Sequence, residues 1–240
     1  FLFFFKLNPM STAEDYLSGQ VLLIDKPLHW TSFQAVNKLR WKIRRAFNIK
    51  KIKVGHAGTL DPLATGLLVI CTGKMTKQID TFQGQIKEYT GTFVLGSTTP
   101  SFDLETEIDQ TYPTEHLTEQ LIKNATSQFI GDINQYPPVF SAIKKDGKRL
   151  YEFARAGEDV EIKSRKVNIS EFEITKIDGL NIDFRVVCSK GTYIRSLAHD
   201  FGKALNSGAH LSALRRTKIG NFNVIDAHSP EKFIEQLSSE

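Results

Sequence analysis

The segment Gly55-His-Ala-Gly-Thr-Leu-Asp-Pro-Leu-Ala-Thr-Gly66 carries the strongest structural signal in this sequence. Its glycines and proline predict a structured loop, because glycine lets the backbone turn sharply or approach a ligand closely. Pro62 biases Asp61 toward an extended conformation, so the backbone would aim the Asp61 carboxylate in one direction. An isolated Asp-Pro pair more often caps a turn, but the density of glycine, histidine and proline around Asp61 favours a functional loop.

Regular elements are predicted before this loop. Residues 21–25 form an apolar run that ends at Lys26-Pro27, which predicts a buried strand. Thr31 is expected to open a helix, because Thr31 and Gln34 have the spacing of a capping box. Apolar residues then follow at helical spacings of three and four, at Phe33, Val36, Leu39, Ile43 and Phe47.

Later segments add strands and helices without a regular β-α-β period. The expected strands are 67–71, 88–95 and an antiparallel pair, 167–177 and 180–189, joined by the turn Asp178-Gly179. The expected helices are 114–129, 191–205 and a last one after Pro230. This mixture predicts an α+β fold with a mixed, mainly antiparallel sheet and flanking helices.

Length and composition set further limits. A chain of 240 residues with 40% hydrophobic content can bury the core of one domain. Two cysteines, Cys71 and Cys188, give no disulfide framework, so we expect a reducing compartment and no structural metal. The apolar start Phe-Leu-Phe-Phe-Phe is too short for a signal peptide or a membrane span. Residues 1–12 are therefore expected to be a disordered tail or the product of an upstream start.

Positive charge is unevenly distributed, although the formal net charge is only +4. The stretch from Arg40 to Lys53 is rich in lysine and arginine and contains no acid. Such asymmetry suits a polyanionic partner, whereas a single basic run is as often a solvated helix face. Residues 135–165 are rich in turn formers and charges, so we expect a long basic loop around one short helix.

Three residues are candidates to share a site with Asp61. A working carboxylate is usually oriented by an arginine, and Arg195 is the candidate, although a surface cation is an equal interpretation from sequence alone. Tyr89, at the start of a predicted strand, is either a stacking platform for a base or a core residue. His56 lies in the same loop as Asp61, where most histidines are simply exposed.

Six segments, in order from about residue 21 to residue 220, resemble the bacterial tRNA pseudouridine-55 synthase family, known as TruB. They are Leu22-Leu-Ile-Asp-Lys-Pro27 with Trp30-Thr-Ser32; Gly55 to Gly66; Tyr89 to Gly96; Gln135-Tyr-Pro-Pro-Val-Phe-Ser-Ala-Ile-Lys144 with Gly147-Lys-Arg-Leu-Tyr151; Cys188-Ser-Lys-Gly-Thr-Tyr-Ile-Arg195; and Leu211-Ser-Ala-Leu-Arg-Arg216. The glycine segment alone is a specific signal, and six ordered matches make coincidence implausible.

The resemblance implies roles for matching residues. Asp61 is similar to the family's catalytic aspartate, Arg195 to the arginine paired with that aspartate, and Tyr89 to the tyrosine stacked on the target uracil. Lys26 resembles a lysine that supports the active site, and His56 the histidine that replaces the flipped nucleotide. Together with these two, the implied substrate-binding set contains Tyr193, Gly58 and Arg215.

The resemblance also implies a pseudouridine synthase fold, in a single catalytic domain over residues 13–240. An insertion at about 135–165 would clamp the T arm of tRNA, and uridine 55 would be isomerised without a cofactor or metal. Because the sequence stops soon after Arg216, we expect no C-terminal RNA-binding (PUA) domain. We further expect a monomer that binds tRNA in the cytoplasm and no membrane.

Mechanism and competing functions stay open at this point. Asp61 could attack C6 of the base, attack C1′ of the ribose, or abstract a sugar proton to give a glycal. The competing functions are a non-catalytic RNA-binding protein or tRNA folding chaperone, and a pseudouridine synthase that acts on another RNA. The joint presence of Asp61, Tyr89 and Arg195 favours an enzyme.

Overall fold

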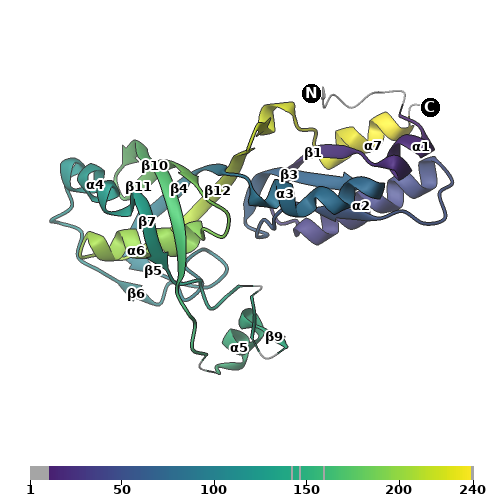
Figure 1. Ribbon diagram of the computed structural model, residues 1–240. Helices are drawn as coiled ribbons and strands as arrows, with labels where there is room; N and C mark the ends of the chain where they lie inside the picture. The colour runs from purple at the N-terminus through teal and green to yellow at the C-terminus, as the bar shows by residue number, and fades with distance from the viewer. Residues whose placement is uncertain (1–10, 142, 146, 159, 239–240) are drawn as a thin grey trace. The chain divides into compact units, whose positions relative to one another are not determined.

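The computed structural model describes residues 11–238 apart from 142, 146 and 159 (Figure 1). The chain forms two compact units. Unit 1 consists of the described residues up to Tyr89 and from Arg215 onward, and unit 2 consists of Thr90–Leu214. The chain passes between the units within β4 (Lys87–Leu95) and β12 (Ala209–Ile219), so each of these strands contributes residues to both.

Unit 1 contains a sheet with the strand order β1-β3-β12, in which β2 pairs with β3 and β13 pairs with β12. Its other strands are β1 (Val21–Lys26), β2 (Val54–His56), β3 (Ala64–Thr72) and β13 (Phe222–Asn223). Its helices are α1 (Ala13–Ser18), α2 (Ser32–Ala46), α3 (Ile79–Gly84) and α7 (Pro230–Ser238), with 3-10 turns η1 (Gly73–Gln78) and η3 (Val224–Asp226).

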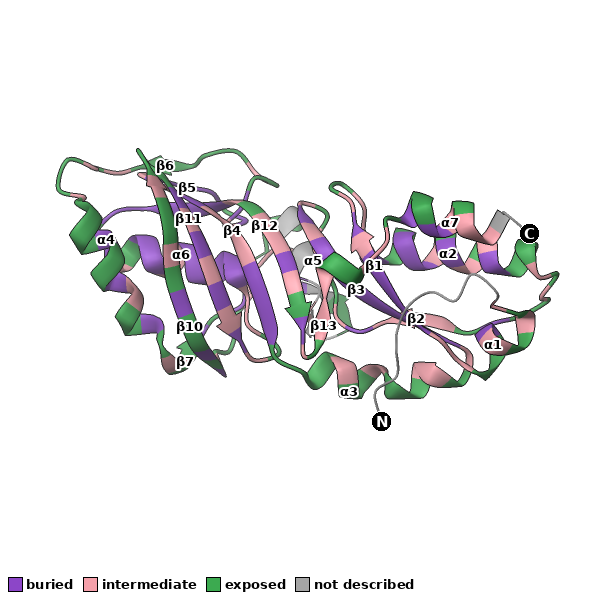
Figure 2. Cartoon of the chain, turned by 90° about the horizontal axis from the view of Figure 1, so that it is seen from above, coloured by how far each residue is buried: buried purple, intermediate pink, exposed green. Residues whose placement is uncertain are grey.

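Helix α2 shows why these residues fold as they do. The predicted capping box is present: the Gln34 amide donates to Thr31 Oγ1 over 3.0 Å, and the Thr31 amide donates to Gln34 Oε1 over 2.7 Å. The inner face of the helix is fully buried at Ala35, Leu39 and Ile43, where it packs in one core cluster with β1, β3 and α7. Figure 2 shows this buried stripe beside the buried strand β3.

Unit 2 is built on the strand order β12-β4-β11-β10-β7. The remaining strands are β5 (Ser97–Thr98), β6 (Gln110–Thr111), β7 (Gly131–Gln135), β8 (Lys144–Lys145), β9 (Lys148–Arg149), β10 (Arg165–Asp178) and β11 (Asn181–Cys188). The helices are α4 (Glu119–Ala125), α5 (Leu150–Ala156) and α6 (Ile194–Ala204), with a 3-10 turn η2 (Thr126–Phe129).

The core of unit 2 is aromatic. Phe93 of β4 stacks on Phe184 of β11 with ring centroids 4.1 Å apart. Phe201 of α6 is fully buried and lies 5.3 Å from the ring of Phe172 and 5.8 Å from that of Phe93. These rings join the helix to one face of the sheet, since aromatic side chains bury large areas and favour tilted or offset contacts.

The predicted fold class is confirmed: it is a mixed, mainly antiparallel sheet with helices. The hairpin through Gly179, whose φ is +60°, is present. The predicted helix 114–129 is too long, because the chain enters α4 only after its N-cap Thr118. The first helix α1 and strand β12 were not predicted. Residues 135–165 do contain one short helix, α5, preceded by the small β8–β9 hairpin.

The N-terminal prediction falls mostly outside the described residues, which begin at Ser11; Thr12 is the N-cap of α1. A single catalytic domain over residues 13–240 stays a prediction. Among the residues that the structure describes, no helix combines the length and apolar character needed to cross a membrane.

Phe201→Ala is expected to lower the free energy of unfolding by about 3–5 kcal/mol, because it leaves a cavity among buried rings. Urea unfolding followed by circular dichroism measures this. As a control, Phe33→Ala on the outer side of α2, where Phe33 is 66% exposed, should change it by less than about 0.5 kcal/mol. Equal losses for both variants would contradict this account of the core.

Candidate active site

Asp61 lies in unit 1, in the loop that connects the end of β2 at His56 to the start of β3 at Ala64. Backbone hydrogen bonds restrain this loop. The Ala64 amide donates to the Asp61 carbonyl over 3.0 Å, and the His29 amide donates to the Pro62 carbonyl over 2.8 Å. Asp61 itself is partly exposed. The loop therefore presents the carboxylate from a fixed backbone.

A buried hydroxyl fixes the residue before Asp61. Ser32, the first residue of α2, accepts a hydrogen bond from the Leu60 amide over 2.9 Å and donates one to the Leu60 carbonyl over 3.1 Å. Both backbone groups of Leu60 are thus satisfied by one side chain. This contact ties the start of α2 to the loop of Asp61.

A second anchor comes from Arg216 on β12, which is 1% exposed. Its Nε donates to the Leu67 carbonyl over 2.8 Å, and its Nη2 donates to the Gly58 carbonyl over 3.0 Å. A longer bond of 3.5 Å joins Nη1 to the Thr59 carbonyl. The guanidinium therefore binds backbone on both sides of Asp61.

The glycines of this segment serve turns, as predicted: Gly58 and Gly66 have φ of +101° and +102°, which favour glycine. The interpretation that glycine leaves room for a ligand is wrong for two positions. A Cβ on Gly66 would lie 2.3 Å from the Arg216 carbonyl oxygen, and one on Gly55 would lie 2.7 Å from Ile79 Cδ1. The protein itself fills that space.

Lys26, at the end of β1, is fully buried. Its ammonium donates to the Trp30 carbonyl over 2.6 Å and to the Pro27 carbonyl over 3.0 Å. Burial lowers the pKa of Lys26 to about 8, the nearby Asp61 carboxylate opposes that change, and the charge on Arg216 adds to it. Asp61 and Arg216 are thus both near enough to Lys26 to act on it electrostatically.

His56, Tyr89 and Arg215 also belong to unit 1. Burial lowers the pKa of His56, the charge on Arg216 lowers it further, and a hydrogen bond with the Gly58 backbone raises it. Tyr89 is 8% exposed on β4. Arg215 forms a bidentate ion pair with Asp25 of β1, with N–O distances of 2.7 and 2.9 Å.

Arg195 and Tyr193 belong to unit 2, at the start of α6. Arg195 is buried; its Nη1 donates to the Phe140 carbonyl over 2.8 Å, and its Nε lies 3.6 Å from Oδ2 of the buried Asp103. Tyr193 is fixed through Gln135, which exchanges side-chain hydrogen bonds of 2.8 and 3.0 Å with the Tyr193 backbone. Arg195 is therefore not the surface cation that sequence alone also allowed.

The structure divides the predicted site residues into two groups. Unit 1 brings Asp61, Lys26, His56 and Gly58 together around Arg216. Unit 2 holds Arg195 and Tyr193, together with Asp103. Sequence reasoning missed Ser32, Asp103 and Arg216; the buried cation Arg216 lies directly after Arg215 in a matched segment, which was the available signal.

Metal-ligand clusters were also sought. In the part of the chain that the structure describes, no group of three or more histidine, cysteine, aspartate and glutamate side chains could hold a metal ion.

Comparisons with known proteins identify the family of this chain. Residues 44–194 match the model described as TruB family pseudouridylate synthase (N terminal domain), and residues 195–239 match the tRNA pseudouridylate synthase B C-terminal domain. tRNA pseudouridine synthase B of Flavobacterium johnsoniae is 68% identical, over 94% of this chain and 99% of that relative. The enzyme of the same name from Phocaeicola vulgatus is 58% identical, over 94% and 96%.

Among solved structures, the chain resembles one of a Cbf5-Nop10-Gar1 complex with a TM-score of 0.70 and 30% identity, over 94% of this chain and 56% of that one. It also resembles an H/ACA RNP bound to a substrate RNA containing 2′-deoxyuridine, with a TM-score of 0.66 and 28% identity, over 92% and 53%. The chain thus spans little more than half the length of these solved chains.

The fold and these matches define a pseudouridine synthase, an isomerase. The relatives narrow this class to enzymes of transfer RNA. The chain belongs to the TruB family of tRNA pseudouridine synthases.

The buried Lys26 ammonium predicts a pH-dependent stability. Because its pKa is about 8 in the folded state and near 10.5 when unfolded, the unfolded chain binds more protons between these values. Below pH 8 Lys26 is charged in both states, so burial of its charge lowers the free energy of unfolding by the full amount. This destabilisation decreases as the pH rises toward 10.5. The free energy of unfolding, from urea titrations at pH 7.5 to 10, should therefore rise for the wild type relative to Lys26→Met. Parallel pH curves for the two proteins would contradict this.

Proposed function

We propose that this chain converts uridine 55 in the T arm of tRNA to pseudouridine and that Asp61 supplies the carboxylate on which the reaction depends. The observation that carries the proposal is the place of Asp61: it lies on the anchored β2–β3 loop, beside buried Lys26, in a chain of the TruB family. A carboxylate on a restrained backbone needs little further ordering to reach its target, which is where positioning contributes to catalysis.

The reaction exchanges one bond for another within the same nucleotide. The bond between N1 of uracil and C1′ of ribose breaks, the base turns while it stays bound, and C5 joins C1′. C5 loses a proton and N1 gains one, so substrate and product contain the same atoms. Because no electrons or groups leave, we propose that no cofactor or metal takes part. Asp61 acts as a nucleophile at C6 or C1′, or as the base that takes a sugar proton.

The target base must leave a folded T loop before it can react, at a cost on the order of a few kcal/mol. In this proposal Tyr89 stacks on the extruded uracil and His56 fills the gap that it leaves. The family segments give Arg195 the role of the arginine that orients the catalytic carboxylate, and Tyr193 that of a residue of the pocket wall. Matching positions in the family segments support these roles, and the burial of Arg195 suits an orienting residue better than a surface cation.

Lys26, Gly58 and Arg215 complete the proposed substrate-binding set. Lys26 is held by two carbonyls, and Gly58 is held by Arg216, so both support the loop of Asp61. Arg215 is partly exposed while it pairs with Asp25, which leaves part of its guanidinium accessible to a phosphate.

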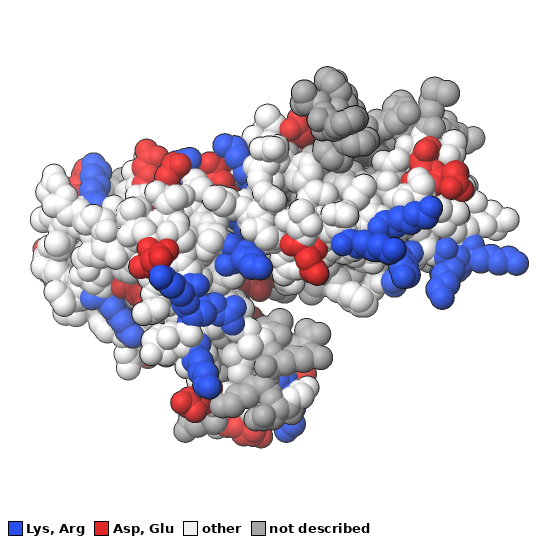
Figure 3. All heavy atoms as spheres, in the orientation of Figure 1, with Lys and Arg blue, Asp and Glu red and all other residues white. Residues whose placement is uncertain are grey.

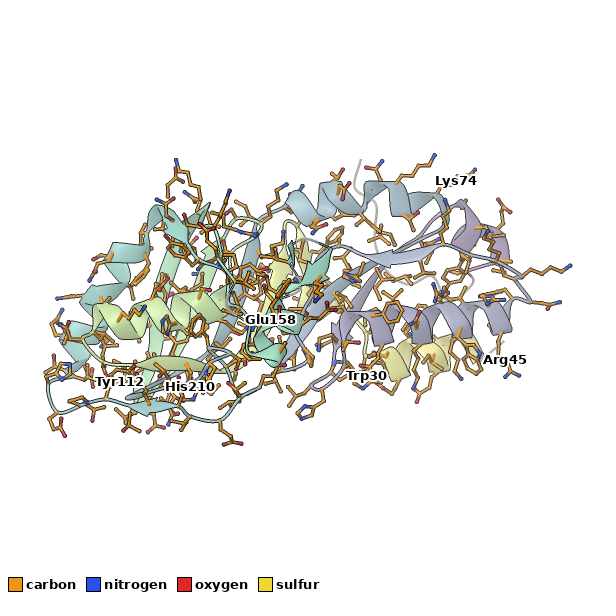
Figure 4. All side chains as sticks on the ribbon, turned by 90° about the horizontal axis from the view of Figure 1, so that it is seen from below. Trp30, Arg45, Lys74, Tyr112, Glu158 and His210 are labelled. Atoms are coloured by element: carbon orange, nitrogen blue, oxygen red, sulfur yellow. The ribbon has the colours of Figure 1, made fainter. Side chains whose placement is uncertain are left out.

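We propose that tRNA is also bound outside this loop, by the outer face of α2 and the residues that follow it. Between Asp25 and Asp61 the sequence contains no acid. Trp41 is 50% exposed, and the charged groups of Lys42 and Arg45 lie 5.2 and 5.0 Å from its ring. Figure 3 shows the basic side chains gathered on this part of unit 1, and Figure 4 shows Arg45 on α2 and Trp30 just before the start of that helix.

The insertion at about 135–165 is proposed to clamp the T arm, through the β8–β9 hairpin and α5. We also propose a monomer that works in the cytoplasm. Cys71 and Cys188 are buried and form no disulfide, which suits a reducing compartment.

Asp61→Asn is expected to abolish tritium release from tRNA that carries uridine labelled at C5, because the amide is neither nucleophile nor base. Its dissociation constant for tRNA should stay within about threefold of the wild-type value, since the carboxylate serves the chemical step. Asp80→Asn, at an exposed aspartate of α3, is the matched control and should keep full activity. Turnover by the Asp61→Asn protein would contradict the assignment.

Removing cations from α2 should weaken the salt dependence of tRNA binding. The double variant Lys42→Gln and Arg45→Gln should lower the slope of log K against log salt by about 2, if each side chain contacts one phosphate. Filter binding at several salt concentrations measures the slope. Lys123→Gln, at an exposed lysine paired with Glu119 on α4, is the control and should leave it unchanged. An unchanged slope in the double variant would show that these α2 side chains do not bind tRNA phosphates.

A further inference from the structure

Arg216 is the largest fully buried side chain in the part of the chain that the structure describes. A buried charge is costly unless hydrogen bonds compensate its lost hydration. Arg216 has such bonds, to the carbonyls of Gly58, Thr59 and Leu67. Carbonyl oxygens carry no net charge, so the guanidinium keeps its full positive charge within unit 1.

These carbonyls are not scattered over the fold. Gly58 and Thr59 lie three and two residues before Asp61, and Leu67 lies on β3, the strand that follows the loop. We call Gly58-Thr59, before Asp61, and Leu67, after it, the two arms of the loop. A planar guanidinium presents its donors in a fixed fork, so one side chain sets the spacing between these two arms. Ser32 fixes Leu60 between them, through hydrogen bonds to the Leu60 amide and carbonyl.

The backbone at Gly58 and Gly66 is adapted to the nearby Arg216. Gly66 has a φ of +102°, and any Cβ there would lie 2.3 Å from the carbonyl oxygen of Arg216. At Gly58, whose φ is +101°, a Cβ would lie 3.6 Å from Arg216 Nη1. Gly66, at the start of β3, therefore permits the close approach of β12 at the residue that supplies the guanidinium, whereas Gly58 is required by its positive φ.

The charge of Arg216 also reaches the groups around Asp61. It lowers the pKa of both Lys26 and His56, after the larger effect of burial on each. The hydrogen bonds to the loop and the effects on neighbouring pKa values thus both identify Arg216 as a residue that acts on the surroundings of Asp61.

We propose that Arg216 is a positioning residue for pseudouridine formation, whose guanidinium holds the two arms of the β2–β3 loop so that the Asp61 carboxylate stands where it reacts. This inference rests on the proposed role of Asp61. Arg216 acts through the loop backbone and does not touch the substrate. Its loss should slow the chemical step much more than it weakens tRNA binding.

Arg216→Lys and Arg216→Gln test the proposal. Lysine keeps the buried charge but has one nitrogen, which cannot span these carbonyls; glutamine removes the charge as well. Both variants should lower the single-turnover rate constant at saturating tRNA by about 100-fold, the scale that misplacement of a reacting group produces. The dissociation constant for tRNA should change by less than about threefold. Rates are expressed per tRNA-binding-competent protein, so that a partly unfolded sample cannot imitate a positioning effect.

The control is Arg185→Gln in unit 2, which removes the same charge from an arginine paired with Glu171 and should keep the wild-type rate constant. If the glutamine variant does not fold, Arg216→Lys decides. Gly58→Ala then tests the contact from the loop side, because alanine is strained at that φ and should show the same fall in rate.

A rate constant within about threefold of wild type in folded Arg216→Lys protein would overturn the proposal. Asp61→Asn is measured in parallel. If Asp61→Asn is inactive while Arg216→Lys is normal, only the role of Arg216 is wrong. If Asp61→Asn turns over, the proposed role of Asp61 is wrong whatever Arg216 does.

Discussion

The loop that carries Asp61 depends on the need of buried backbone groups for hydrogen-bond partners. Where β3 leaves the loop it is buried from Gly66 onward, and the Leu67 carbonyl finds its partner in the Arg216 side chain. Removing such a partner leaves a buried acceptor unsatisfied, at a cost of about 1–3 kcal/mol. The same guanidinium also binds the Gly58 carbonyl. One side chain therefore satisfies a buried carbonyl of the unit 1 core and restrains the loop of Asp61.

This constraint links the sequence pattern to the chemistry. Gly66 follows from the close approach of β12, Ser32 follows from the need to satisfy Leu60, and buried Lys26 places a cation near Asp61. None of these residues has to meet the uridine to influence its reaction. The second group, Arg195 with Asp103 and Tyr193 with Gln135, is equally fixed within unit 2. Both groups consist of side chains held by backbone carbonyls, backbone amides and ion pairs, as a site that must keep its geometry requires.

Local signals predicted the elements whose stability is local. The capping box at Thr31 and the turn at Gly179 lie within a few residues of the structure that they specify, and both are confirmed. Strand β12 was missed because its short apolar alternation, at Ala209, Leu211 and Ala213, is followed by the adjacent cations Arg215 and Arg216. Arg216 is buried only because partners more than a hundred residues away supply carbonyls, and no local pattern encodes them. Asp103 was missed for the same reason, because its partner Arg195 is distant in the sequence. The resemblance to a family supplied the roles of Asp61, Tyr89 and Arg195, which remain predictions.

In the proposed function, Asp61 makes this chain a pseudouridine synthase for one position of tRNA. The most direct measurement maps pseudouridine across total RNA from cells that carry either the wild-type gene or Asp61→Asn at its natural locus. The account predicts that pseudouridine disappears from position 55 of tRNAs in the variant cells and persists at every other site in tRNA and ribosomal RNA. Retention at position 55, or a loss confined to another RNA, would contradict it.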